Sequence, residues 1–256
     1  MFYIYGLSNV AEDIIASCLH DRQGLQAPLE HAAVADWTLI YSEHDNQEIL
    51  PKRKNLLIHT RTLELVLPLG SILPARFGLI ANDVAQIARL IGDQSEQIAK
   101  AFDRVQGAVE LGVRVSFPRQ AAIDATLRED PALSSERDYL SKKSRHAHFE
   151  VAEFGGRLAD QLDRRRGLAQ RSLLSALLPL VKDHVLRKPE DDTEVLRAEF
   201  LIDSQMQISF EKALAAYCAE LNFAPGEEPL IQVIGPVPMY NFVSLNLPFD
   251  RDKVAA

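Results

Sequence analysis

The residues from Val109 to Phe117 alternate strictly between two kinds of side chain. The odd positions are apolar, and the even positions are glutamate, glycine, arginine and serine. A period of two residues predicts a β-strand with one buried and one solvated face. Strands of this kind are typical of an antiparallel sheet that is covered on one side only. We therefore expect the second half of the chain to be built on such a sheet.

The segments that follow this strand predict how the sheet is completed. Apolar residues in a near-heptad pattern indicate a long helix after residues 131–134, and a poorly periodic apolar stretch up to Pro179 indicates a further helical piece. Residues 181–187 and 195–203 flank a turn-rich stretch and read as a hairpin, followed by a helix over 209–221 and a strand over 230–234. The order strand, helix, two strands, helix, strand is that of a ferredoxin-like domain with helices on one face of an antiparallel sheet.

The first hundred residues predict a separate α+β domain. Strands are expected over 2–5 and 37–42 and should pair with each other. Asn9 and Glu12 have the spacing of a capping box at the start of the first helix, and further helical periodicity covers 56–67 and 84–105. We predict an N-terminal α+β domain over 1–107, a C-terminal ferredoxin-like domain over 108–244, and a tail over 245–256.

Composition excludes several classes of protein. The chain has 256 residues, with 28 Lys and Arg against 36 Asp and Glu, a net charge of −8, and 47% hydrophobic and 25% charged residues. This composition is that of an ordinary soluble domain, and the acidity argues against general nucleic-acid binding. Neither a signal peptide nor a membrane-spanning stretch is expected. The two cysteines, Cys18 and Cys218, favour a reducing, cytoplasmic setting and buried apolar positions on helices.

The residues that could carry chemistry favour ordinary structural roles. His146, His148, Glu150 and Glu153 form the nearest approach to a metal cluster, but His148 is turned away from the helix face that His146 and Glu150 share. We expect no metal, no cofactor and no catalytic residues. The basic runs 52–54 and 164–166 are expected to be solvated, with a protein-docking patch as the alternative. The pair Gly155-Gly156 inside a helical pattern indicates close packing or a kink.

Two segments shaped by proline and glycine stand out instead, over 73–78 and 235–243. Pro74 fixes a backbone dihedral angle and Gly78 permits a conformation closed to other residues, so the first segment is predicted to be a shaped turn. Pro236 and Pro238 preset an extended backbone in the second segment, with little conformational entropy to lose on binding.

These segments resemble conserved blocks of the gas vesicle protein GvpF/GvpL family. Residues 73–78, LPARFG, with 59–67 before them, resemble its "H…VLE…VLPxRFG" block, and 235–243, GPVPMYNFV, resemble its closing "GPWPPYxFV" block. Similar matches occur at 5–7 ("YGI"), 109–115, 139–143 ("YLxxK") and 198–203 ("AAFLVD"), in the family's order along nearly the whole chain. Val237 and Met239 stand where the family has Trp and Pro, and Leu79 where it often has Thr.

The resemblance implies two α+β domains, the second a modified ferredoxin-like fold, and a minor protein needed for gas vesicle assembly rather than an enzyme. Its implied partners are the main shell protein and other accessory gas vesicle proteins, with no nucleic acid, membrane span or small-molecule substrate, and its implied location is the gas vesicle in the cytoplasm. It does not separate the F from the L subfamily. The alternative is a ferredoxin-like small-ligand sensor or an uncharacterised enzyme.

The candidate interaction residues lie in the two Pro/Gly segments. We expect them either to dock apolar shell subunits or only to cement the interface between the domains. They are Arg76, Phe77, Gly78, Gly235, Pro236, Pro238, Tyr240 and Phe242.

Overall fold

The computed structural model describes residues 1–46, 48–142 and 148–245. The chain folds into two compact units, one of Met1–Glu110 together with the segment from Pro236 onward, and one of Leu111–Gly235. Both units combine helices with an antiparallel sheet, so the predicted α+β class is confirmed. The sequence assigns 236–244 to the second domain, whereas the structure groups this segment with the first unit. The reason is apolar burial, because Met239, Phe242 and Leu245 have almost no exposed surface.

The first unit is built on a five-stranded sheet with the order β2-β3-β1-β4, in which β5 also pairs with β1. The predicted pairing of the first strand with the strand at Trp37 is confirmed, since β1 and β3 pair antiparallel. The sequence analysis missed β2, whose side chains are largely half-buried or exposed and lack a clear period. The strands are β1 (Phe2–Ser8), β2 (Leu29–Val34), β3 (Trp37–Glu43), β4 (Ile72–Pro74) and β5 (Ile80–Ala81).

Helices of the first unit bury both faces of its sheet. The buried residues Tyr5, Ile40 and Leu63 belong to one core cluster, which also includes side chains of α1 and α2. Trp37 stacks on Phe102 of α4 with ring centroids 5.9 Å apart. The helices are α1 (Glu12–Leu19), α2 (Arg53–Val66), α3 (Val84–Asp93) and α4 (Ser95–Val105).

The predicted capping box at the start of α1 is wrong. The helix begins after Ala11 without a side-chain cap. The Asn9 carboxamide oxygen instead accepts a hydrogen bond from the main-chain N–H of Ser71, at 3.0 Å. Glu12 accepts one from the main-chain N–H of Ala33, at 3.2 Å. Both side chains thus satisfy main-chain donors outside the helix, which local spacing cannot anticipate.

The second unit carries a four-stranded sheet with the order β7-β8-β6-β9. The elements succeed one another as predicted, except that three helices stand between the first two strands, where a long helix and a further helical piece were expected. The strands are β6 (Ala108–Ser116), β7 (Asp183–Leu186), β8 (Glu194–Asp203) and β9 (Leu230–Val237). The helices are α5 (Arg119–Glu129), α6 (Pro131–Ser141), α7 (His148–Leu177) and α8 (Gln207–Ala219), with short 3-10 turns η1 (Leu178–Leu180) and η2 (Ser204–Met206).

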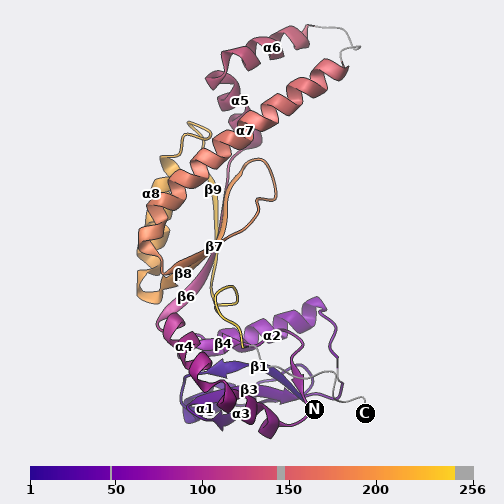
Figure 1. Cartoon of the computed structure of the whole chain (residues 1–256), viewed down its shortest axis with the longest axis vertical. Helices are drawn as coiled ribbons and strands as arrows, with labels where there is room; N and C mark the ends of the chain where they lie inside the picture. The colour runs from indigo at the N-terminus through magenta and orange to yellow at the C-terminus, as the bar shows by residue number, and fades with distance from the viewer. Residues whose placement is uncertain (47, 143–147, 246–256) are drawn as a thin grey trace. The chain divides into compact units, whose positions relative to one another are not determined.

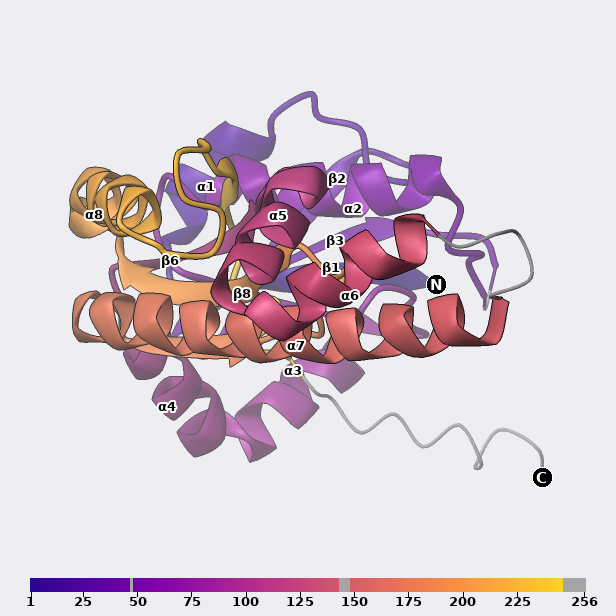
Figure 2. The ribbon, with the colours of Figure 1, turned by 90° about the horizontal axis from the view of Figure 1, so that it is seen from above.

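The long helix α7 organises the second unit. Figure 1 shows α7 and α8 lying along the sheet, and Figure 2 shows α5 and α6 beside α7. The poorly periodic stretch before Pro179 is indeed helical and forms the end of α7. Phe200 of β8 and Phe210 of α8 are almost fully buried, and their ring centroids lie 5.3 Å apart. Within the described residues, no helix combines the length and the apolar character required to cross a membrane.

Candidate interaction site

The first Pro/Gly segment is a strand that ends in a turn. Residues Ile72–Pro74 pair with β1, so the predicted shaped turn begins only after Pro74. The main-chain N–H of Ala75 still donates to the carbonyl of Tyr5 at 2.8 Å. The main-chain N–H of Leu79 donates to the carbonyl of Arg76 at 3.1 Å and closes the turn. Gly78 has a φ of 86°, in the left-handed region that favours glycine. The backbone around Arg76 and Phe77 is therefore held at both ends.

The Phe77 side chain packs into a cluster of buried aromatic rings. Its ring centroid lies 6.0 Å from Tyr3 and 5.8 Å from His59, both in edge-on geometry. His59 in turn stacks on Tyr5, with centroids 5.7 Å apart. The main-chain N–H of Gly78 donates to the Tyr3 hydroxyl at 3.3 Å. The turn is thus anchored to β1 and α2 by ring packing and by a hydrogen bond.

His59 is the polar centre of this cluster. Its Nδ1 lies 2.9 Å from the Tyr3 hydroxyl, and the ring also hydrogen-bonds to the main chain of Ala75. Burial lowers the pKa of His59 to about 4, although the bond to Ala75 acts in the opposite direction. The imidazole is therefore neutral at pH 7. Through its hydrogen bonds to Tyr3 and Ala75, it links α2 to β1 and to the turn at residues 75–79.

The second Pro/Gly segment ends in a compact turn. The main-chain N–H groups of Phe242 and Val243 both donate to the carbonyl of Met239, at 3.2 and 3.0 Å. The side chains of Met239 and Phe242 are buried at 0% and 7% exposure. Arg104 of α4 donates to the carbonyl of Phe242 at 3.2 Å. This segment is thus an integral part of the first unit.

Glu110 anchors the second segment from within. Its carboxylate accepts hydrogen bonds from the main-chain N–H and the Nδ2 of Asn241, at 2.9 and 2.6 Å. The even positions of β6 were predicted to face solvent, but Glu110 is only 2% exposed. This part of the prediction is wrong because the Asn241 turn provides polar partners that permit a buried carboxylate. Strand periodicity alone contains no signal for hydrogen-bond partners that lie 131 residues further along the chain.

The structure brings the first Pro/Gly segment beside the residues that directly follow the second one. Ala75 forms a parallel bridge with Leu245, and the main-chain N–H of Leu245 donates to the carbonyl of Pro74 at 3.0 Å. The candidates Arg76, Phe77, Gly78, Pro238, Tyr240 and Phe242 all belong to the first unit. Gly235, with a φ of 132°, is the last residue of the second unit, and the exposed Pro236 begins the return to the first.

Arg76 and Tyr240 are the exposed residues of the two segments that carry a charged or an aromatic side chain. The Tyr240 side chain is 36% exposed, and its hydroxyl hydrogen-bonds to Thr60 of α2. Burial of this hydroxyl, with the nearby charges of Glu64 and Glu110, raises the pKa of Tyr240 to about 12. The ring is therefore a neutral, oriented, partly exposed aromatic group. Arg76 adds an exposed positive charge.

The other chemical candidates from the sequence do not converge. His146 lies outside the described residues, and His148, Glu150 and Glu153 are all exposed on α7. Within the described ranges, no three His, Cys, Asp or Glu residues are grouped so as to hold a metal ion. Burial raises the pKa of Cys218 to about 12, so this thiol stays protonated at neutral pH.

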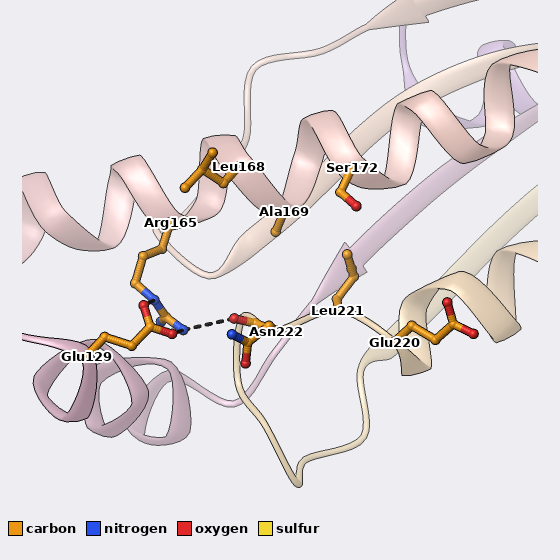
Figure 3. Close-up of a pocket in the computed structure, with 8 residues that line it drawn as sticks. All are labelled: Glu129, Arg165, Leu168, Ala169, Ser172, Glu220, Leu221 and Asn222. Atoms are coloured by element: carbon orange, nitrogen blue, oxygen red, sulfur yellow. Dashed lines mark hydrogen bonds and ion pairs between the residues drawn. The ribbon is translucent and has the colours of Figure 1, made fainter.

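The basic run at 164–166 was predicted to be solvated, but its central residue is buried. Arg165 is only 6% exposed, and its guanidinium binds the Glu129 carboxylate through two donors at 2.7 and 2.9 Å. It also donates to the carbonyls of Asn222 and Phe223, at 3.0 and 2.9 Å. Figure 3 shows this side chain between α7, α5 and the segment after α8. Arg165 also lines a pocket of about 300 Å³. Arg165 is therefore a structural cation of the second unit.

The fold and the site together define a class: α+β proteins of two units, each with its own antiparallel sheet, in which a segment that follows the second unit completes the first. The family of gas vesicle synthesis proteins GvpL/GvpF matches residues 1–244, and the chain belongs to this family.

Individual relatives agree with this assignment. Gas vesicle protein F of Dolichospermum flosaquae is 25% identical over 216 residues, which cover 82% of this chain and 85% of that protein. The crystal structure of GvpF from Anabaena sp. PCC7120 superposes with a TM-score of 0.76 at 21% identity, covering 96% of this chain and 98% of that one. The crystal structure of GvpF from Microcystis aeruginosa gives a TM-score of 0.70 at 21% identity, with 95% and 99% covered. These structures share the fold of this chain.

Proposed function

We propose that this protein acts in gas vesicle assembly by binding the main shell protein and other accessory gas vesicle proteins. The family assignment supports a role in the gas vesicle, and the relatives named above are gas vesicle protein F. We place this role at the gas vesicle in the cytoplasm. Binding and release of subunits require no catalytic group.

The observation that carries this proposal is that both Pro/Gly segments are held on the first unit. The main-chain N–H of Leu245, just past the second segment, donates to the carbonyl of Pro74, and the partly buried Phe77 and the buried Phe242 hold the two segments in place. Exposed Arg76 and partly exposed Tyr240 remain on this ordered support. Because the backbone is already fixed, little conformational entropy is lost when a partner docks.

A gas-filled shell explains why such a surface is needed. The shell subunit must present an apolar face to the gas, so before assembly it exposes surface that aggregates. An accessory protein with aromatic side chains on a rigid support binds apolar surface well, since aromatic and arginine residues dominate protein interfaces. The net charge of −8 keeps such a carrier soluble.

Co-purification of the shell protein tests the proposal. We expect Arg76→Ala and Tyr240→Ala each to lower the recovery of shell protein severalfold relative to wild type, while the melting temperature stays within a few degrees. Arg89→Ala and Tyr139→Ala are matched controls, because both residues are exposed and lie outside the two segments. Equal recovery from all five proteins would show that the segments serve only the internal architecture of the first unit.

A further inference from the structure

Strand β9 forms an edge of the sheet in the second unit. It pairs with β6 on one side and has no strand on the other side within the described sheet. None of its residues is buried, and Leu230 and Ile234 are 60% and 54% exposed. By contrast, Leu111 and Val115 of β6 have no exposed surface. The outer side of β9 thus presents unpaired main-chain groups together with exposed apolar side chains.

Residues 230–235 of β9 lack the usual protection of an edge strand. Natural edges carry charged side chains, above all lysine, or prolines and bulges within the strand. Residues 230–235, LIQVIG, contain neither charge nor proline. Prolines stand only at the two ends of this run, at Pro229 and Pro236. An uncharged run of six residues bracketed by prolines can therefore pair over a short, defined length.

We propose that β9 is a self-association edge, at which the β9 strands of two copies of this chain pair antiparallel and join two sheets. When the Gln232 residues of the two copies lie opposite each other, the two-fold axis passes between them. Leu230 of each copy then lies opposite Ile234 of the other. Alternate residues point to the same face, so these apolar pairs and the central Gln232 pair share one face. The run is thus complementary to itself, as a two-fold interface requires.

The flanking residues fit the same register. Glu228 of one copy falls opposite Pro236 of the other, so the acidic residues before β9 do not face each other. Pro229 falls opposite Gly235, and neither proline has an N–H to contribute to the ladder. Pairing therefore stops at both ends, which produces a closed dimer. This inference is independent of the proposed binding of shell protein, which concerns residues of the first unit.

Sedimentation velocity across a range of protein concentrations tests the register. We expect wild type to dimerise at micromolar concentration, and Gln232→Lys and Gln232→Glu each to remain monomeric because like charges meet at the axis. An equimolar mixture of the two variants should recover the dimer, since Lys then lies opposite Glu. Gln232 is exposed, so both variants should keep the wild-type circular dichroism spectrum. Gln205→Lys, an exposed position outside β9, is the charge-matched control and should dimerise.

Three results would overturn the inference: monomeric wild type at all concentrations, dimeric Gln232→Lys, or a mixture that stays monomeric. If wild type is monomeric but Gln232→Lys reduces recovery of shell protein, the edge accepts a strand from another protein and the homodimer is rejected. Recovery of shell protein by Tyr240→Ala is measured separately. Failure of the proposed function and failure of the dimer are therefore distinguishable.

Discussion

The buried carboxylate of Glu110 holds Asn241 by two hydrogen bonds, to the main-chain N–H at 2.9 Å and to Nδ2 at 2.6 Å. Glu110 lies at the start of β6, whereas Asn241 belongs to the segment that closes the first unit. A carboxylate buried in this way is tolerated because donors replace the water that it loses. This pair therefore fixes the turn at Asn241 to the first unit.

Replacing Glu110 with Gln should loosen that turn. Asn241 donates to both oxygens of the Glu110 carboxylate. In glutamine an NH2 group replaces one of these oxygens and cannot accept a hydrogen bond, so at least one buried hydrogen bond is lost. We expect a loss of about 1–3 kcal/mol in the free energy of unfolding, measured by urea denaturation, together with faster chymotrypsin cleavage near Tyr240 and Phe242. Glu228→Gln, at an exposed position, is the control. Identical urea midpoints for the two variants would show that the pair does not stabilise the fold.

Arg165 should be required for the stability of the second unit. Lysine keeps the charge but cannot bind Glu129 through two donors and also reach the carbonyls of Asn222 and Phe223. We expect Arg165→Lys to cost about 2–4 kcal/mol, read from thermal and urea unfolding. Arg164→Lys, one residue earlier and exposed, should change stability by less than about 0.5 kcal/mol. Similar effects for the two variants would contradict the structural role of Arg165.

His59 should make the protein sensitive to acid. Its folded pKa of about 4 lies below the ordinary value of 6.5, so the unfolded chain binds the proton first as the pH falls. The contribution of neutral His59 to the free energy of unfolding is complete above pH 6.5. It is lost as the pH falls from 6.5 to 4, by about 3 kcal/mol in total. In His59→Gln, whose carbonyl can still accept from Tyr3, the slope of stability against pH in this window should decrease. An unchanged slope in urea titrations at pH 7, 6, 5 and 4.5 would assign the acid sensitivity to other groups.

Gly155 and Gly156 offer a stabilising change. The sequence predicts close packing or a kink here, but the Cβ that alanine would add at either position meets no atom within 4 Å, and α7 is assigned as one uninterrupted helix. Each Gly→Ala replacement should therefore raise stability by about 0.5–1 kcal/mol through helix propensity. Gly78→Ala should act oppositely, at a cost of about 1–2 kcal/mol, because Gly78 has a φ of 86°. A loss of stability in Gly155→Ala would reveal a packing role for the glycine.

Sequence patterns predicted the local elements well where burial follows a regular period. The strand at Val109 alternates in burial over its second half, the last helix buries one face, and turn residues separate the two strands of the hairpin, so periodicity and turn residues locate these elements. The strand over 29–34 was missed because it is half exposed on both faces. Long-range polar contacts could not be predicted, since Asn9 and Glu12 bind main-chain groups far along the chain and Glu110 is covered by Asn241. The two Pro/Gly segments were identified in sequence, but only the fold shows that Leu245, two residues past the second segment, bridges to Ala75 of the first.

The bridge between Ala75 and Leu245 has a consequence for biosynthesis. The ribosome makes residues 1–110 first, yet the segment that covers Glu110 and pairs beside Pro74 is made only after the whole second unit. The second unit is continuous in sequence and can fold as soon as it emerges. The first unit must wait, with part of its apolar interior uncovered, until residues 236–245 leave the ribosome. Vectorial synthesis thus lets the second unit complete its fold before the first unit does.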